Sequence, residues 1–355
     1  MFKAGVTVLH EPVVVTGDAD VVISGTAPGT VLRASAKFKG KALIHVRHGA
    51  RVTIKDLTLD GNRAALEKPV GLPASNQTFA EFYQSNGIVV EDTQGLAIEN
   101  VKLRNVANYP VIVTRGVQVR IVRVQITDSG SHNAKGRNNA SGGILLEEGT
   151  RDFVVRNCRI ARVRGNGIWT HSNYTSPRNA DGLIEENDIR DLARDAIQVG
   201  HATSIRVERN TGGRIGWPVA EVDVESEAWP VAIDTAGNVD QSTYAFNTFE
   251  ELNGKCIDLD GFHHGEVRRN RCVNTKPVAN YPHGQFGIVM NNNNPDMKSE
   301  HITIVDNELE GMKYGGIYVI GPGTCTPNPC CADAGPVYCL GACCFRATCI
   351  CAVRL

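Results

Sequence analysis

The chain lacks the features that mark several common protein classes. Its 355 residues carry a formal net charge of −1, so no basic surface points to nucleic acid or an anionic membrane as a partner. No segment approaches the roughly 18 consecutive apolar residues of a transmembrane helix. The first ten residues contain no charged segment followed by an apolar one, so no secretory signal is visible.

Cysteine is scarce until the end of the chain. Only Cys158, Cys256 and Cys272 precede residue 325, whereas eight of the 11 cysteines lie between Cys325 and Cys351. This tail has no Cys-x-x-Cys pair with a matching second pair and no Cys/His zinc spacing. It is interpreted either as a disulfide or metal knot, or as out-of-frame translation.

A short unit recurs through most of the sequence before this tail. Its first strand has the pattern apolar-x-apolar-x, begins with Ile, and repeats at a shortest spacing of 24 residues. Alternation of this kind is typical of β-strands, and a fixed period of this length without helices predicts a parallel β-helix. The predicted first strands are 44–47, 88–91, 112–115, 144–147, 168–171, 197–200, 233–236, 257–260, 288–291 and 317–320.

A second strand in each unit provides an independent alignment. Its closing position is Leu57, Val101, Val124 and Cys158 in the early units, and Asn187, Asn210, Asn247, Asn270 and Asn307 in the later ones. Asparagines stacked at one position predict an amide ladder, in which each side chain donates to the next carbonyl. Asparagine also suits the left-handed bend expected between two faces of a coil.

These repeats resemble the right-handed parallel β-helix, or pectin-lyase-like, superfamily over roughly residues 20–322. The resemblance implies an all-β fold, a single-stranded right-handed parallel β-helix over residues 1–322 with long loops on one side. Residues 323–355 are expected to form a separate Cys-rich, non-repeat tail, which is either out of frame or disordered. Enzymes of this superfamily are usually exported, so the resemblance implies a secreted or periplasmic protein. The sequence does not indicate an oligomeric state.

Long polar segments interrupt the repeat at 61–86, 129–142, 172–182, 216–230 and 274–286. They leave from corresponding places in the coil, so we expect them to border a groove on one side of the solenoid. The aromatic residues of the first segment, Phe79, Phe82 and Tyr83, either stack on sugar rings or pack against the solenoid.

Acidic side chains gather on the outward face of the middle coils. When each first-strand Ile is position 0, positions +1 and +3 point outward, and they hold Asp234 in one coil and Asp258 and Asp260 in the next. Asp234 and Asp258 are expected about 5 Å apart, and Asp234 and Asp260 about 8 Å apart. Retaining and inverting glycosidases use carboxyl separations in these two ranges.

The sequence therefore predicts a carbohydrate-active enzyme, a glycoside hydrolase with paired aspartates, that acts on a polysaccharide or oligosaccharide in a groove of the solenoid. Asp258 and Asp234 are the expected acid and base or nucleophile, Asp260 a positioning partner and His263 a secondary proton-transfer group. The expected substrate-binding residues are His171, Glu147, Gln198, His264, Lys255 and Asn291.

The aspartates resemble those of polygalacturonase-like hydrolases, which also carry three aspartates on adjacent coils. The companion motifs of those enzymes are absent, and only Ile233-Asp-Thr, Ile257-Asp-Leu-Asp and His263-His-Gly are present, so two alternatives remain open. The lyase branch uses an Arg or Lys base with Ca²⁺ on acidic residues, so a Ca²⁺-assisted lyase or epimerase is the first alternative, with the ion on the three aspartates. The second is a non-catalytic β-helix that binds glycans or builds a surface, since aspartates on a solenoid face are usually only solvated. No other cofactor is expected.

Overall fold

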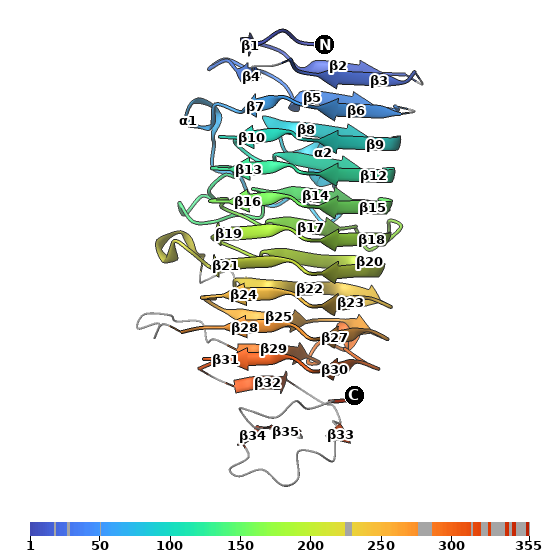
Figure 1. Ribbon diagram of the computed structural model, residues 1–355, viewed down its shortest axis with the longest axis vertical. Coiled ribbons are helices and arrows are strands. Elements are labelled where there is room, and N and C mark those ends of the chain that lie inside the picture. The colour runs from blue at the N-terminus through green and yellow to red at the C-terminus, as the bar shows by residue number, and fades with distance from the viewer. Residues whose placement is uncertain are drawn as a thin grey trace.

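The coils stack along one axis in the computed structural model, from the blue N-terminal strands to the orange ones (Figure 1). The structure describes residues 1–17, 19–26, 29–49, 51–223, 229–275, 286–313 and 315–320, together with the backbone of four short strands after residue 325. Three ladders of parallel strands form the faces of the solenoid, which confirms the predicted parallel β-helix.

The first face carries the predicted first strands. In stacking order it contains β2 (Val13–Thr16), β5 (Ala42–Arg47), β8 (Asn86–Glu91), β11 (Val111–Thr114), β14 (Ile144–Glu147), β17 (Ile168–His171), β20 (Ile197–Glu208), β22 (Val231–Asp240), β25 (Lys255–Leu259), β29 (Phe286–Asn291) and β32 (Gly315–Ile320). Strands β20 and β22 are long because each continues through the corner into the second face.

The second face contains β3 (Val21–Ser24), β6 (Val52–Lys55), β9 (Gln94–Glu99), β12 (Val117–Val122), β15 (Arg151–Arg156), β18 (Asn179–Glu185), the end of β20, β23 (Thr243–Ala245), β27 (Glu266–Arg268) and β30 (Thr303–Val305). The short strand β26 (Phe262–His263) pairs with the end of β22.

The third face is an 11-stranded sheet made of β1 (Gly5–Leu9), β4 (Thr30–Ala34), β7 (Thr58–Asp60), β10 (Lys102–Arg104), β13 (Gln125–Thr127), β16 (Arg159–Ala161), β19 (Asp188–Leu192), β21 (Thr211–Ile215), β24 (Thr248–Glu250), β28 (Arg271–Val273) and β31 (Glu308–Glu310).

Helices are few and short in the described part of the chain: α1 (Arg63–Leu66), α2 (Phe79–Phe82), and the 3-10 turns η1 (Val219–Glu221) and η3 (Pro295–Met297). Within these residues no helix approaches the length or apolarity needed to cross a bilayer. The tail contributes the antiparallel pair β34 (Tyr338–Leu340) and β35 (Cys343–Phe345), and β36 (Val353–Arg354), which pairs with β33 (Thr326–Pro327) and β30. Its assignment as a separate, non-repeat tail stays a prediction.

The core is the interior of the solenoid, filled by the inward residues of all three faces. Side chains such as Ile88, Val90, Ile121 and Ile126 are buried there with an exposed fraction of 0%. Stacking the same inward positions coil upon coil buries a continuous apolar column, which is what a repeat unit cannot achieve alone. A disulfide between Cys256 and Cys272 joins β25 to β28 across this interior.

One predicted first strand is wrong by one residue. The strand at 112–115 was aligned with Ile112 at position 0, but Val111 pairs with Ile88 and Ile144, so Val111 and Val113 point inward. Ile112 instead lies on the outer face, in a second apolar cluster. The sequence alternation could not fix the register here because both faces of this strand are apolar and buried.

The asparagine ladder is confirmed. Each amide Nδ2 donates to the Oδ1 of the next asparagine at 2.8–2.9 Å, from Asn187 through Asn210, Asn247 and Asn270 to Asn307. The left-handed bend, however, falls one residue earlier than expected. Glu186, Arg209, Phe246, Arg269 and Asp306 have the positive φ angles, and the ladder asparagines do not.

Candidate active site

The predicted aspartates meet on the outer side of the first face. Gln198 pairs in register with Asp234, and Asp234 with Asp258, on three consecutive strands. Their relative placement was therefore predicted correctly. Asp260 follows at the end of β25, where its backbone N–H donates to the Thr235 carbonyl at 3.2 Å. We use the name aspartate cluster for Asp234, Asp258, Asp260, Asp195 and the ammonium of Lys255.

Lys255 is the cation of the aspartate cluster. Its Nζ forms an ion pair with Asp258 Oδ2 and lies 5.5 Å from the centre of the Trp229 ring. The pair is sheltered, since Asp258 is only 5% exposed. The other oxygen of Asp258, Oδ1, is buried without a hydrogen-bond partner among the described residues. A carboxylate oxygen left unpaired in this way is costly unless a ligand or water occupies it.

Asp195 was not predicted, although it belongs to the aspartate cluster. It is 3% exposed, and its Oδ1 accepts a hydrogen bond from the Val231 backbone N–H at 3.0 Å. Asp195 stands two residues before the first-strand Ile197, the position that Lys255 holds before Ile257. A comparison of this position between coils, which also holds Asn166, could have found it.

A chain of amides leads into the aspartate cluster from the preceding coil. Asn166 Nδ2 donates to Gln198 Oε1, and Gln198 Nε2 donates to Asp234 Oδ2 at 2.8 Å. Gln198 is therefore oriented by Asn166 and occupies one oxygen of Asp234. The expected role of Gln198 as a substrate contact stays a prediction. Its hydrogen bonds indicate that it positions the carboxyl group of Asp234.

Burial, and then the proximity of the other carboxyl groups, raises the pKa values in the aspartate cluster. Burial raises the pKa of Asp260 to about 7, and the charge of Asp258 adds to the effect. Burial raises the pKa of Asp195 to about 6. The pKa of Asp234 is raised well above its usual value by burial and then by its three aspartate neighbours. Burial also raises the pKa of Asp258, but Lys255 opposes this. The aspartate cluster thus holds protons at neutral pH.

Glu147 does not line the aspartate cluster, contrary to the expectation. Its carboxylate is 0% exposed and accepts hydrogen bonds from the backbone N–H groups of Phe79 and Ala80 at 2.9 and 2.8 Å and from Thr114 Oγ1 at 2.7 Å. The reason is helix α2, which packs over this part of the first face. His171 lies beside Glu147 in register, against the rings of Phe79 and Trp169. Among the described residues no hydrogen bond or ion pair joins it to the aspartate cluster.

His263 and His264 lie around the corner from the aspartate cluster. The bend at Gly261 carries them to the second face, where both Nδ1 atoms approach Asp240 Oδ1, at 3.6 and 3.8 Å. A role for His263 in proton transfer with Asp258 is therefore not supported by the geometry. Asn291, at the end of β29, lies one coil beyond Asp260, and its backbone N–H lowers the pKa of Asp260.

The loops expected to border the groove are described only in part. Glu221, in the acidic segment 221–227, approaches Arg164 and His132 at 3.6 and 3.8 Å rather than the aspartate cluster. Residues 224–228 and 276–285, with His283, lie outside the described residues. The aromatic side chains Phe79 and Tyr83 are buried against the solenoid, so packing is the correct interpretation for these two.

Comparisons with known proteins agree on the architecture. Residues 42–212 match the family model described as a right handed beta helix region. DFA-IIIase from Arthrobacter chlorophenolicus A6, solved in complex with GF2, aligns with a TM-score of 0.52 and 12% identity over 88% of this chain and 79% of that chain. ORF18 of Geobacillus virus E2 aligns with a TM-score of 0.51 and 11% identity over 90% and 55%.

The surface adhesin PfbA of Streptococcus pneumoniae aligns with a TM-score of 0.48 and 10% identity over 86% of this chain and 83% of that chain. No curated protein sequence is significantly similar to this chain. At such identities the solved structures show the fold, and the chemistry must be argued from the residues themselves.

Proposed function

We propose that this protein is a carbohydrate-active enzyme that hydrolyses a glycosidic bond at the aspartate cluster. Residues 42–212 match the right handed beta helix model, and the same coils continue to β32. The supporting observation is the meeting of Asp234, Asp258 and Asp260 on neighbouring strands, with one carboxylate paired to Lys255. A β-helix of similar shape, DFA-IIIase, was solved in complex with GF2.

Glycoside hydrolysis needs one carboxylic acid and one carboxylate at the same bond. Asp258 is the best candidate for the carboxylate, because Lys255 favours its charged form. Asp260 is the best candidate for the acid, because its pKa of about 7 keeps it protonated in mildly acidic solution, and its Oδ1 has no hydrogen-bond partner among the described residues. Asp234 is less suited to donate a proton, since Gln198 occupies its Oδ2.

This assignment predicts the stereochemistry. Asp260 directly follows β25, two residues after Asp258, and its backbone N–H still donates to the neighbouring coil at Thr235. The rise of an extended chain therefore places the two side chains about 6.6 Å apart. That separation leaves room for a water molecule and falls within the inverting range of about 6.5–9.5 Å. If Asp234 were the acid instead, its separation from Asp258 of about 5 Å would predict retention.

The test is a screen of neutral and acidic oligosaccharides for new reducing ends, followed by nuclear magnetic resonance of the first-formed anomer. We expect hydrolysis with inversion, and a loss of kcat of about 10²–10⁴-fold in Asp258→Asn and in Asp260→Asn. Asp260→Asn should recover activity on aryl glycosides whose leaving group needs no proton, whereas Asp258→Asn should not.

Asp181→Asn is the matched control, because Asp181 is exposed on the second face and should tolerate the change without loss of activity. Wild-type turnover by both aspartate variants would exclude this site. Binding of a glycan without any product would instead favour the non-catalytic alternative. An unsaturated product that absorbs in the ultraviolet would favour the lyase.

A further inference from the structure

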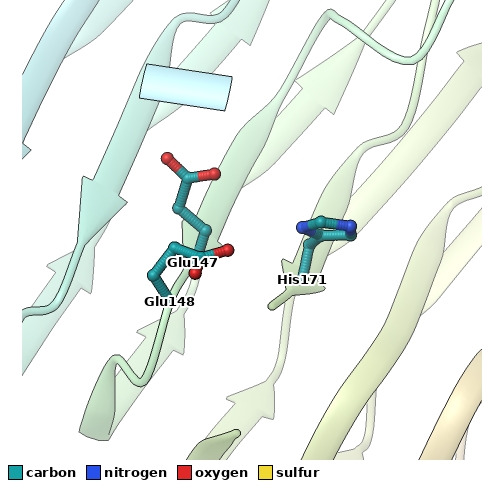
Figure 2. A group of neighbouring side chains, drawn as sticks. All are labelled: Glu147, Glu148 and His171. Carbon is teal, nitrogen blue, oxygen red and sulfur yellow. The ribbon is translucent and has the colours of Figure 1, made fainter. Parts of the chain in front are cut away.

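A second group of ligating side chains lies three to four coils from Asp260, at the corner where β14 and β17 end. It consists of Glu147, Glu148 and His171 (Figure 2). One oxygen from each glutamate and one ring nitrogen of His171 lie within 4.8 Å of one another. We call this group the Glu-Glu-His corner.

The backbone explains why these three residues converge. Glu147 and His171 pair in register on neighbouring strands, so they point the same way. Residues 147 and 148 would point to opposite faces in a regular strand. Glu148, however, has a φ of 57°, and this left-handed bend turns its side chain back toward His171.

Neither glutamate forms an ion pair with a Lys or Arg side chain among the described residues. Glu147 is 0% exposed and Glu148 is 4% exposed. Three hydrogen-bond donors satisfy part of Glu147, but burial still raises its pKa to about 7. Glu148 Oε1 accepts one hydrogen bond, from the Asn173 backbone N–H at 2.9 Å. Buried carboxylates without a cationic side chain are costly unless a proton or a metal ion compensates them.

His171 supplies the third, independent observation. Its Nδ1 is buried and has no hydrogen-bond partner among the described residues. The ring is fixed between Phe79 and Trp169, with centroids 5.0 and 5.1 Å away. An imidazole nitrogen without a hydrogen-bond partner can offer its lone pair to a metal ion, and a ring nitrogen of His171 lies within 4.8 Å of both glutamates.

We propose that Glu147, Glu148 and His171 bind a divalent transition-metal cation. A set of two carboxylates and one imidazole suits Mn²⁺ or Zn²⁺, whereas Ca²⁺ takes oxygen ligands alone. The ion would join β14 to β17. Because Glu147 also accepts the N–H groups of Phe79 and Ala80, the ion would tie α2 to the same coils.

Mn²⁺ is the better probe, because the eight cysteines after residue 324 offer thiolates that attract Zn²⁺. Tag-free protein stripped with a chelator is titrated with Mn²⁺, and the free ion is followed by electron paramagnetic resonance. We expect one saturable site per chain, a rise in the unfolding temperature with Mn²⁺, and no displacement by an equal concentration of Ca²⁺.

The variants are Glu148→Gln, whose side-chain oxygen can still accept from Asn173, and His171→Asn. Each should weaken Mn²⁺ binding by at least about tenfold. Asp240→Asn is the matched control, since Asp240 lies at the other histidine-rich corner with His263 and His264 and should leave binding unchanged.

The absence of a saturable site in the wild type would overturn the proposal and leave a shared proton as the compensating charge at Glu147. Unchanged affinity in both variants, or displacement of Mn²⁺ by Ca²⁺, would also overturn it, because the ion would then be bound without the His171 nitrogen.

Discussion

One row of outward positions on the first face has two characters. From β8 to β17 it holds Val89, Ile112, Leu145 and Trp169, which pack with Phe79, Tyr83 and Tyr109 in a buried apolar cluster. From β20 to β25 the same row holds Gln198, Asp234 and Asp258. The strands stay paired in register along this row, so the difference comes from the side chains and from what covers them. A long insertion supplies an apolar cover in the first half, and carboxyl groups gather in the second.

The largest effect on stability is expected from a substitution that removes part of the apolar cover over β8 to β17. Phe79 is 4% exposed and contacts Tyr83, Tyr109 and Trp169 through its ring. Phe79→Ala should lower the free energy of unfolding by about 3–5 kcal/mol, measured by urea denaturation. Phe82→Ala, at a partly exposed position of the same helix, is the control and should cost less. Equal losses would mean that α2 does not cover the first face as described.

A second variant tests a similar contrast inside the solenoid. At the ladder position the early coils have apolar residues or Cys158, and the late coils have asparagine. Asn247 is 1% exposed and exchanges side-chain hydrogen bonds with Asn210 and Asn270. Asn247→Ala leaves those partners unsatisfied and should cost about 1–3 kcal/mol. The exposed Asn293→Ala should change stability by less than about 0.5 kcal/mol. An unchanged free energy of unfolding in Asn247→Ala would show that the ladder contributes no net stability.

The smallest effect is a dependence of stability on pH. The pKa of Asp260 is raised to about 7 and that of Asp195 to about 6, so the folded state keeps protons that the unfolded chain releases. Their contribution to stability is fully present below about pH 4, the unfolded value, and is lost as the pH rises to about 7. The urea concentration at the midpoint of unfolding should therefore decrease as the pH is raised from about 4 to about 7, and it should decrease less in Asp260→Asn. An equal decrease of the midpoint in that variant would contradict the raised pKa of Asp260.

The sequence predicted the coil, the ladder and the stacking of Asp234 on Asp258, because each depends on spacing alone. It failed where the cause was remote or lay outside the strand. Glu147 is covered by the helix that begins at Phe79, 68 residues earlier, and no pattern in the sequence around Glu147 indicates this contact. Asp195 was missed because it precedes its strand. His263 was misplaced because the bend at Gly261 turns the chain onto another face.

The ladder of amides has a direction. Each rung from Asn187 to Asn270 gives its N–H to the rung that follows, and Asn307 ends the series by donating to the carbonyls of Val267 and Val305. Among the asparagines, loss of a terminal rung breaks the side-chain hydrogen bond to one neighbour, whereas loss of an inner rung breaks the bonds to two. A coil at the end of the series can therefore be removed with the loss of fewer amide-to-amide hydrogen bonds than a coil in the middle.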